Sequence, residues 1–283
     1  MAGIAGLVRA ALPAVPGVNQ LPGIKKARPG DFTGLSRSRP GVPVDRADVA
    51  AYARVCGFPP KDTAPLPYPH LLAFPLHLEI MSDPAFPWPA IGTVHIENSI
   101  TSQRPVRLGE TLDVTTSVGT PSPHAKGVVL DFVTTVTAAG DATVWESTSS
   151  YLRRGQGSEP AAEGLRLDST PPGTIDWRLP ADLGRRYARV SGDLNPIHLY
   201  PLTARALGFK RQIAHGMWSL ARCVAAIENR LPDAVRVEAA FKKPVFLPGT
   251  VSFGLEQQHD GWAFALTSPR DESPHLVGRS TSL

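Results

Sequence analysis

Two short segments of this chain occur twice, and no other feature of the sequence limits its fold as strongly. Tyr52–Gly57 reads Tyr-Ala-Arg-Val-Cys-Gly, and Tyr187–Gly192 reads Tyr-Ala-Arg-Val-Ser-Gly. Likewise, Arg104–Thr111 (Arg-Pro-Val-Arg-Leu-Gly-Glu-Thr) is echoed by Lys243–Thr250 (Lys-Pro-Val-Phe-Leu-Pro-Gly-Thr). The two matches keep their order, at offsets of 135 and 139 residues. An ordered repeat at nearly one offset indicates a duplicated unit, so we expect two halves with the same architecture.

The stretch between the halves has the composition of a linker. Residues 153–173 are weakly apolar and are broken by glycine and proline, ending in the run Pro171–Gly173. A chain of 283 residues is long enough for one large domain or two medium ones. We therefore predict an N-terminal domain over residues 1–155, a linker over residues 156–174 and a C-terminal domain over residues 175–283.

Each half ends in segments that favour β-strands. They are rich in β-branched residues with partial alternation, and Gly140-Asp141 and Asp260-Gly261 supply turn residues for hairpins. The predicted strands are Leu112–Val118, Gly127–Thr137 and Ala142–Leu152 in the first half, and Val235–Phe241, Val251–Gln257, Trp262–Thr267 and Leu276–Ser282 in the second.

The clearest helix is predicted over Gly216–Leu231. Met217, Leu220 and Val224 belong to an apolar stripe at helical spacing, and the stripe is broad enough that we expect a sheet to wrap around it. Its counterpart in the first half, Pro75–Met81, is weaker and lies among prolines. A central helix followed by consecutive antiparallel strands, written twice, indicates an α+β fold.

Composition excludes several classes of protein. The net charge of +4 is mild, and no dense Lys/Arg run alternates with aromatic residues, so we expect no nucleic-acid binding. No apolar run reaches the length of a membrane span, and we expect no membrane association. The apolar stretch Met1–Val18 differs from a secretory signal because Arg9 lies within it and prolines break it. Two cysteines, Cys56 and Cys223, are too few for a disulfide framework, which favours a cytoplasmic protein with buried thiols.

The run Tyr187–His198 carries the strongest chemical signal. Ser191-Gly192-Asp193 ends one helical or turn segment, Asn195 is a good cap for a new helix, and Pro196 suits its first position. Asp193 and His198 then bracket a tight turn, so their side chains converge on a small space. A carboxylate and an imidazole in one site can hold a water molecule and move protons in both directions.

A purely structural interpretation of these residues is also open. Asp193 and Asn195 would then only build a capped turn, and His198 would pack against the core. The same choice applies to Gln212–Met217, which leads into the predicted central helix. There the Gly216 amide, at a helix N-terminus, could bind an oxygen atom that becomes negative during a reaction, or Gly216 could simply let the chain turn.

These residues resemble the hydratase-2 motif of the MaoC-like dehydratase family, which contains (R)-specific enoyl-CoA hydratases. The motif here is Tyr-x-x-Val-Ser-Gly-Asp-x-Asn-Pro-Ile-His, five further residues, Ala204, and then Ala-His-Gly-Met. The resemblance continues through Lys242–Gly249 and covers roughly residues 175–283. It implies a hot-dog domain, which is a long helix wrapped by an antiparallel sheet. Members with a duplicated chain are double hot dogs, and the internal repeat fits that architecture.

The resemblance also implies an activity. Members hydrate trans-2-enoyl thioesters, or dehydrate (R)-3-hydroxyacyl thioesters, carried on CoA or acyl carrier protein, in fatty-acid metabolism. Asp193 and His198 would activate one water molecule, and the Gly216 amide would stabilise the oxyanion. No cofactor is implied, because the thioester itself acidifies Cα, and no zinc-ligand pattern is present. The supporting residues would be Ser191, Asn195 and His215. The active form would be a monomeric pseudo-dimer or a homodimer.

The first half departs from the motif. After Tyr52–Gly57 comes Phe58-Pro59-Pro60, where the second half has Asp193-Leu194-Asn195. We therefore expect the first half to lack catalytic groups and to bind the acyl chain. Two other functions remain open at this stage: a hot-dog acyl-thioesterase, and a non-catalytic acyl-thioester-binding or partner subunit.

Overall fold

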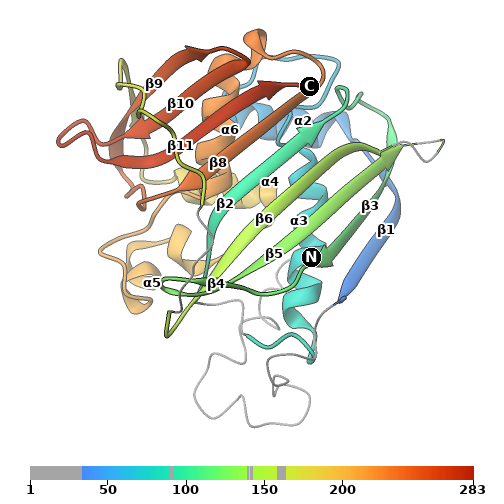
Figure 1. Ribbon diagram of the computed structural model, residues 1–283, viewed down its shortest axis with the longest axis horizontal. Helices are drawn as coiled ribbons and strands as arrows, with labels where there is room; N and C mark the ends of the chain where they lie inside the picture. Colours follow the sequence, from blue (N-terminus) through green and yellow to red (C-terminus); the bar gives the residue numbers. More distant parts are fainter. Residues whose placement is uncertain (1–33, 89–91, 139, 141–142, 158–163) are drawn as a thin grey trace.

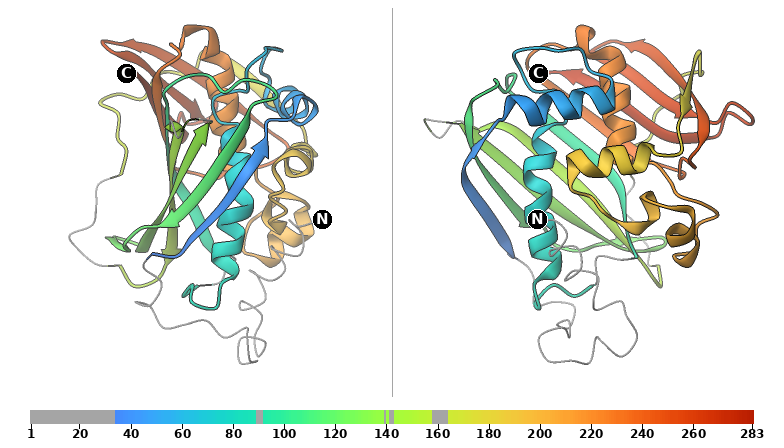
Figure 2. Two further views of the ribbon diagram at one scale, coloured as in Figure 1. Left: turned by 90° about the vertical axis from the view of Figure 1, so that its right-hand side faces the viewer. Right: turned by 180° about the vertical axis from the view of Figure 1, so that it is seen from behind.

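The computed structural model describes residues 34–88, 92–138, 140, 143–157 and 164–283. The segment Met1–Val18 and the turn residue Asp141 lie outside the described residues. The described chain forms one antiparallel sheet of 11 strands, and the helices cover one of its faces (Figure 1 and Figure 2). None of the helices in these ranges has both the length and the apolar character needed to span a membrane.

The elements of the two halves correspond one to one over most of their length. The first half contains β1 (Ser36–Pro43), α2 (Arg46–Cys56), α3 (Pro69–Ser82), β2 (Thr93–Ser102), β3 (Thr111–Val118), β4 (Ser122–His124), β5 (Gly127–Ala138) and β6 (Thr143–Arg154). The second half contains β7 (Ile175–Leu179), α4 (Leu183–Ser191), η3 (Pro196–His198), α5 (Pro201–Ala206), α6 (Gly216–Ile227), η4 (Glu228–Arg230), β8 (Val235–Phe241), β9 (Gly249–Gln258), β10 (Gly261–Thr267) and β11 (Pro274–Ser282).

Strand order shows the duplication directly. The sheet runs β1-β3-β5-β6-β2-β8-β11-β10-β9-β7, so the second half repeats the first in reverse order around the β2–β8 junction. That junction pairs Glu97 with Ala240 and Ser102 with Val235. Each half thus wraps its strands around one long helix, α3 or α6 (Figure 2). The predicted α+β double hot dog is confirmed.

The first sequence repeat has a clear structural reason. Its glycine ends a helix in the left-handed conformation in both halves, Gly57 after α2 (φ 84°) and Gly192 after α4 (φ 73°). The tyrosines of the repeat, Tyr52 and Tyr187, are both buried, and their ring centroids lie 6.3 Å apart. The repeated segment therefore packs the two halves against each other, with Tyr187 in the core.

The second repeat holds the segment that precedes each long helix. The Ala64 amide donates to the Val106 carbonyl, and the Ala214 amide donates to the Val245 carbonyl, both at 2.8 Å. In the second half the Leu247 amide also donates to the Gln212 carbonyl at 2.9 Å. These bonds fix the backbone just before α6 begins.

Several predicted boundaries differ from the structure. The predicted helix over Gly216–Leu231 ends as an α-helix at Ile227 and continues as the 3-10 turn η4. The first-half helix begins at Pro69, well before the predicted Pro75, because α3 continues through Pro75 instead of starting there. The strands β1, β2, β4 and β7 were not predicted, because their sequences lack a dominant apolar alternation.

The described part of the predicted linker packs against the sheet. Residues 164–174, here called the strap, lie on the face of the second-half sheet opposite the helices (Figure 1). Leu165 and Leu167 pack against a small apolar cluster on that face. The Leu165 amide donates to Glu97 Oε1 at 2.8 Å, and Lys242 Nζ donates to the Leu165 carbonyl at 2.9 Å.

Candidate active site

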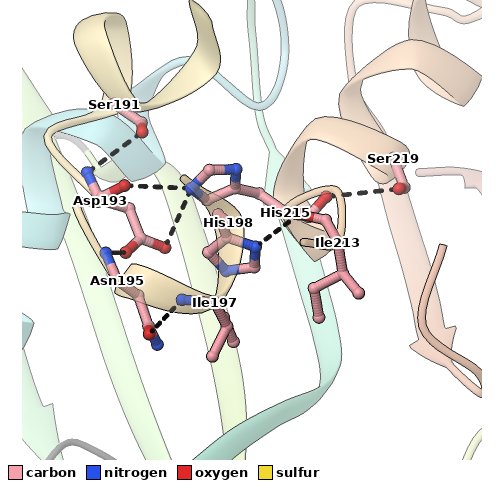
Figure 3. Close-up of polar contacts among 8 residues, drawn as sticks. All are labelled: Ser191, Asp193, Asn195, Ile197, His198, Ile213, His215 and Ser219. Carbon is pink, nitrogen blue, oxygen red and sulfur yellow. Dashed lines mark hydrogen bonds and ion pairs between the residues drawn. The ribbon is translucent and has the colours of Figure 1, made fainter. Parts of the chain in front are cut away.

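Asp193 occupies the first position of a loop that its own neighbours hold rigid. It follows Gly192, the left-handed end of α4. The Asp193 amide donates to Ser191 Oγ at 3.2 Å, and Asp193 Oδ1 accepts the Asn195 amide at 3.1 Å (Figure 3). Such local bonds from Ser and Asp side chains replace helical bonds and fix a turn. The Asp193 side chain keeps 25% of its surface exposed, so a ligand can reach the carboxylate.

Asn195 and Pro196 begin the next turn as the sequence predicts. Asn195 Oδ1 accepts the Ile197 amide at 3.3 Å, and Pro196 is the first residue of η3. The capped segment is only one 3-10 turn, and His198 is its last residue. Ser191 and Asn195 thus hold the loop that carries Asp193 and His198.

His198 presents one nitrogen atom to the protein and leaves the other available. Its Nδ1 lies 2.9 Å from the Ile213 carbonyl oxygen, which can only accept, so Nδ1 carries the proton and Nε2 keeps a lone pair. Burial lowers the pKa of His198 below its usual value, although the nearby Asp193 charge and the Ile213 bond both act in the opposite direction. At neutral pH His198 is therefore a neutral base.

His215 lies against both of these residues. Its ring stacks on that of His198 with centroids 3.7 Å apart and an interplanar angle of 25°. Its Nε2 donates to the Asp193 carbonyl oxygen at 3.0 Å and lies 3.7 Å from Asp193 Oδ2. Burial, with the neighbouring His198, lowers the pKa of His215 to about 3, so it is neutral as well. Within the described residues its buried Nδ1 has no hydrogen-bond partner.

The three side chains converge on one point. Asp193, His198 and His215 each offer one ligand atom, and these atoms lie within 4.8 Å of one another. Figure 3 shows the two stacked rings beside the Asp193 carboxylate, with His215 bonded toward Asp193 and His198 toward Ile213. The sequence has no zinc-ligand pattern, yet the fold brings together three groups of the kind that bind Zn²⁺. Two of their nitrogen atoms, Nδ1 of His198 and Nε2 of His215, already donate to carbonyl oxygens and cannot bind a metal in that state.

Gly216 lies at the N-terminus of α6, directly after His215. The first amides of a helix lack intrahelical partners and carry partial positive charge, so they suit an oxygen that becomes negative. A Cβ on Gly216 would lie 3.2 Å from the Phe241 ring, so this position has no spare room. The three predicted groups, Asp193, His198 and Gly216, therefore lie at one end of the central helix.

Comparisons with known proteins give this geometry a family. Residues 163–264 match the model described as MaoC like domain. The chain is 35% identical over 281 residues to 3-hydroxyacyl-thioester dehydratase X of Mycobacterium tuberculosis, covering 97% of this chain and 96% of that protein. This chain belongs to the MaoC-like dehydratase family. A crystal structure of HtdX of Mycobacterium tuberculosis superposes on it with a TM-score of 0.78 at 34% identity, covering 88% of this chain and 100% of that one. A MaoC-like dehydratase from Phytophthora capsici shares the fold, with a TM-score of 0.74 at 21% identity, covering 89% and 96% of the two chains.

In this MaoC-like dehydratase one positioning residue was not predicted from the sequence. Gly184 in α4 lies so close to η3 that a Cβ there would sit 2.0 Å from the His198 carbonyl oxygen. The next residue, Arg185, donates from Nη1 to the Leu199 carbonyl at 2.9 Å. Helix α4 thus determines how closely η3 packs against it and where His198 lies. Glycine is a poor helix former, but the sequence does not show that the residue packed against position 184 is His198.

The first half also approaches the site. The charge of Asp193 acts on His70, at the start of α3, although burial still lowers the pKa of His70 to about 4. His70 is 5% exposed. No such first-half residue was predicted, because nothing in the local sequence around His70 indicates that it lies near residue 193.

Proposed function

We propose that this MaoC-like dehydratase interconverts (R)-3-hydroxyacyl thioesters and trans-2-enoyl thioesters in fatty-acid metabolism by removing or adding one water molecule. The observation that carries the proposal is the convergence of the Asp193 carboxylate and the neutral His198 ring beside the N-terminus of α6. A carboxylate and a neutral imidazole are the two bases that a water addition needs. The 35% identity with a protein named 3-hydroxyacyl-thioester dehydratase X supports the same reaction.

In the hydration direction, Asp193 and His198 hold one water molecule. Its oxygen bonds to Cβ of the enoyl thioester while one proton passes to this pair, and the Cα–Cβ π electrons move toward the thioester oxygen. The Gly216 amide and the N-terminus of α6 stabilise that oxyanion. The pair then returns one proton to Cα, so that OH and H have been added across the double bond. Dehydration is the same path reversed.

His198 Nε2 is suited to the proton-accepting role. The Nδ1–H bond to the Ile213 carbonyl fixes both the tautomer and the ring plane. His215, stacked on His198, donates to the Asp193 backbone and orients the loop, so we assign it a positioning role. Ser191 and Asn195 position the same loop through their side-chain oxygens.

We further propose a division of labour between the halves. Residues 175–283 supply the catalytic groups, residues 1–155 bind the acyl chain, and residues 156–174 join them. The described first half has Phe58-Pro59-Pro60 after its repeated helix, with no acid or histidine in the place of Asp193 and His198. The buried unpaired thiols Cys56 and Cys223 support a cytoplasmic location. The thioester handle would be CoA or acyl carrier protein, and the active form a pseudo-dimeric monomer or a homodimer.

A hydration assay tests the function. Purified protein is mixed with crotonyl-CoA and with longer trans-2-enoyl-CoAs, loss of the enoyl absorbance is followed, and the product is analysed on a chiral column. We expect the (R)-3-hydroxyacyl-CoA as the product, at a rate that EDTA leaves unchanged because no step requires a metal. A rate that falls with EDTA and returns with Zn²⁺ would assign the three-residue cluster to a metal instead.

The same assay separates the other functions. Release of free thiol without hydration would identify a thioesterase. Binding of enoyl-CoA without any turnover would identify a non-catalytic acyl-thioester-binding or partner subunit. Formation of the (S) product would contradict the proposed stereochemistry while leaving hydration in place.

A further inference from the structure

The first half contains a group of polar side chains between its long helix and the sheet, most of them buried. We call this set the polar belt; its members are His70, His77, His95, Asn98, Thr134 and Tyr151. His70 and His77 lie on α3, and the other four come from β2, β5 and β6. His77 is fully buried, Asn98 is 2% exposed and Thr134 is 2% exposed. The belt therefore lies between α3 and the sheet, where a hot-dog core is expected to be apolar.

The second half shows what these positions hold in an apolar core. Aligning the first residues of the two long helices, Pro69 of α3 and Gly216 of α6, places Met217 at the position of His70 and Val224 at that of His77. On the sheet, the repeat offset of 139 residues places Val237 of β8 at the position of Asn98 of β2. Burying polar groups costs free energy unless each is hydrogen-bonded, so we expect partners, within the protein or on a ligand, for these side chains.

Some belt members satisfy one another. His77 Nδ1 lies 3.2 Å from the Tyr151 hydroxyl, and His77 Nε2 lies 3.3 Å from Thr134 Oγ1. Asn98 Nδ2 donates to the hydroxyls of Ser149 at 2.9 Å and Ser147 at 3.2 Å. These bonds keep the belt polar and fixed in orientation.

Two polar atoms of the belt lack a hydrogen-bond partner among the described residues. Among the described residues, His95 Nε2 and Asn98 Oδ1 are buried and have no hydrogen-bond partner. Buried polar atoms in proteins are nearly always paired with protein, water or ligand. The Asn98 oxygen accepts a hydrogen bond, and the His95 nitrogen either donates or accepts one. A ligand hydroxyl suits either atom, because it donates to Asn98 Oδ1 and accepts from His95 Nε2–H, whereas a carbonyl oxygen cannot bond to Asn98 Oδ1.

The belt starts beside the candidate active site. The His95 ring centroid lies 5.1 Å from that of Phe241, and the Phe241 ring is the nearest neighbour that a Cβ on Gly216 would meet. From there His95 stacks on Tyr151 at 4.7 Å, and Tyr151 contacts His77. A group bound at the start of α6 and extending into the first half would pass along these side chains.

The belt leads on to an apolar end. Tyr151 also belongs to an apolar cluster that includes Ile80, Phe86 and Phe132. The order from the active site is thus polar first and apolar after, which is unlike a channel for a plain alkyl chain. Burial lowers the pKa of His70 and of His95, to about 4 and about 3, so these rings are neutral at pH 7. A neutral polar lining favours an uncharged ligand group over a carboxylate.

We propose that the polar belt hydrogen-bonds a hydroxyl group on the acyl chain of the substrate. This inference rests on the proposed dehydratase function and on the acyl chain entering the first half. The substrate class would then be oxygenated acyl thioesters, and plain alkyl chains of the same length would be poorer substrates because they leave His95 and Asn98 unpaired.

The experiment compares matched substrates. The value of kcat/KM for hydration is measured with trans-2-decenoyl-CoA and with three derivatives, isomers of one another, that carry one hydroxyl at carbon 6, 8 or 10. We expect at least one hydroxylated isomer to exceed the plain chain by about tenfold, as one or two buried neutral hydrogen bonds allow. Asn98→Ala removes the side-chain amide and His77→Val copies the aligned residue of α6, and both should lower that ratio toward one.

Two controls accompany the variants. Ser252→Ala removes a buried hydroxyl that bonds Asp176 on β7, far from the belt in the sheet order, and should leave the ratio unchanged. Thermal melting shows whether each variant folds, and Asn98→Ala alone is used for the test if His77→Val does not fold. Calorimetry of the binding of decanoyl-CoA and its hydroxylated derivatives gives a ratio of affinities that is independent of turnover.

The outcomes distinguish the two proposals. If no enoyl-CoA, crotonyl-CoA included, is hydrated, then the proposed function is wrong. The ratio of affinities from calorimetry then tests by itself whether the belt binds a hydroxyl group. If decenoyl-CoA is hydrated but every hydroxylated isomer is equal or worse in both measurements, the proposal for the belt is overturned. A preference that survives Asn98→Ala and His77→Val unchanged would also overturn it.

Discussion

His198 and His215 are stacked imidazoles in one site, yet their nitrogen atoms face different partners. His198 donates from Nδ1 to the Ile213 carbonyl and keeps Nε2 available, whereas His215 donates from Nε2 to the Asp193 backbone. Which nitrogen is committed decides which ring can accept a proton from water. The difference follows from the backbone carbonyl that each ring meets.

Removing either proposed base should stop hydration. In Asp193→Asn and His198→Gln the side chain keeps its size but loses its proton affinity, so kcat/KM should fall by about 10²- to 10⁴-fold. Steady-state kinetics with crotonyl-CoA measure the loss, and circular dichroism checks the fold. Ser219→Ala, which removes a hydroxyl bonded to the His215 carbonyl, is the nearby control and should stay close to wild type. Near-wild-type activity in Asp193→Asn would contradict the assignment.

At the scale of elements, α4 acts on the site without contacting the reacting atoms. It meets η3 through Gly184, where no space for a side chain remains. Gly184→Ala should push η3 away and displace His198, and a shift of about 1 Å in a reacting group can cost about 10²-fold in rate. Kinetics and melting temperature are measured together.

The matched variant for this test is Gly119→Ala. A Cβ on Gly119 meets Asp131 at 3.6 Å, an ordinary contact, and φ there is not positive. It should change neither rate nor stability substantially. If Gly184→Ala keeps full activity, η3 is held by other contacts, and the role given to α4 is wrong.

The elements also show what sequence could and could not predict. The Asp193–His198 run and the Gly216 helix start were identified because their chemistry is local: a capped turn and a helix N-terminus. The start of α3 was missed because Pro75 normally limits a helix, yet here it lies inside one. The polar belt was missed because its residues meet only through strand pairing and through the packing of α3 on the sheet. Gly184 was missed because a glycine is required there by the nearby His198 backbone, and no local sequence pattern reveals that contact.

At the scale of the whole molecule, buried histidines make stability depend on pH. Burial lowers the pKa of six histidines: His70, His77, His95, His198, His215 and His275. In the unfolded chain they titrate near 6.5, so below that pH the unfolded state binds more protons. Their stabilising contribution is thus complete above pH 6.5 and is lost as the pH falls toward 4 and then 3.

Urea unfolding at pH 7.5, 6 and 4.5 measures this loss. For His70 alone, whose pKa falls from 6.5 to about 4, the contribution is about 3 kcal/mol, because a tenfold change in proton affinity corresponds to about 1.4 kcal/mol. His70→Met should therefore flatten the decrease in the free energy of unfolding between pH 6.5 and 4.5. Replacing the exposed His259 by Gln should leave it unchanged. An equal decrease in wild type and His70→Met would show that His70 does not resist protonation.

The β2–β8 junction has a consequence for any attempt to divide the chain. A fragment that starts after residue 174 would expose the backbone amides and carbonyls of Val235–Ala240, which now bond to β2. An uncovered edge strand recruits another strand. Such a fragment would therefore tend to pair with a second copy of itself, restoring by association of two molecules what the covalent duplication provides within one.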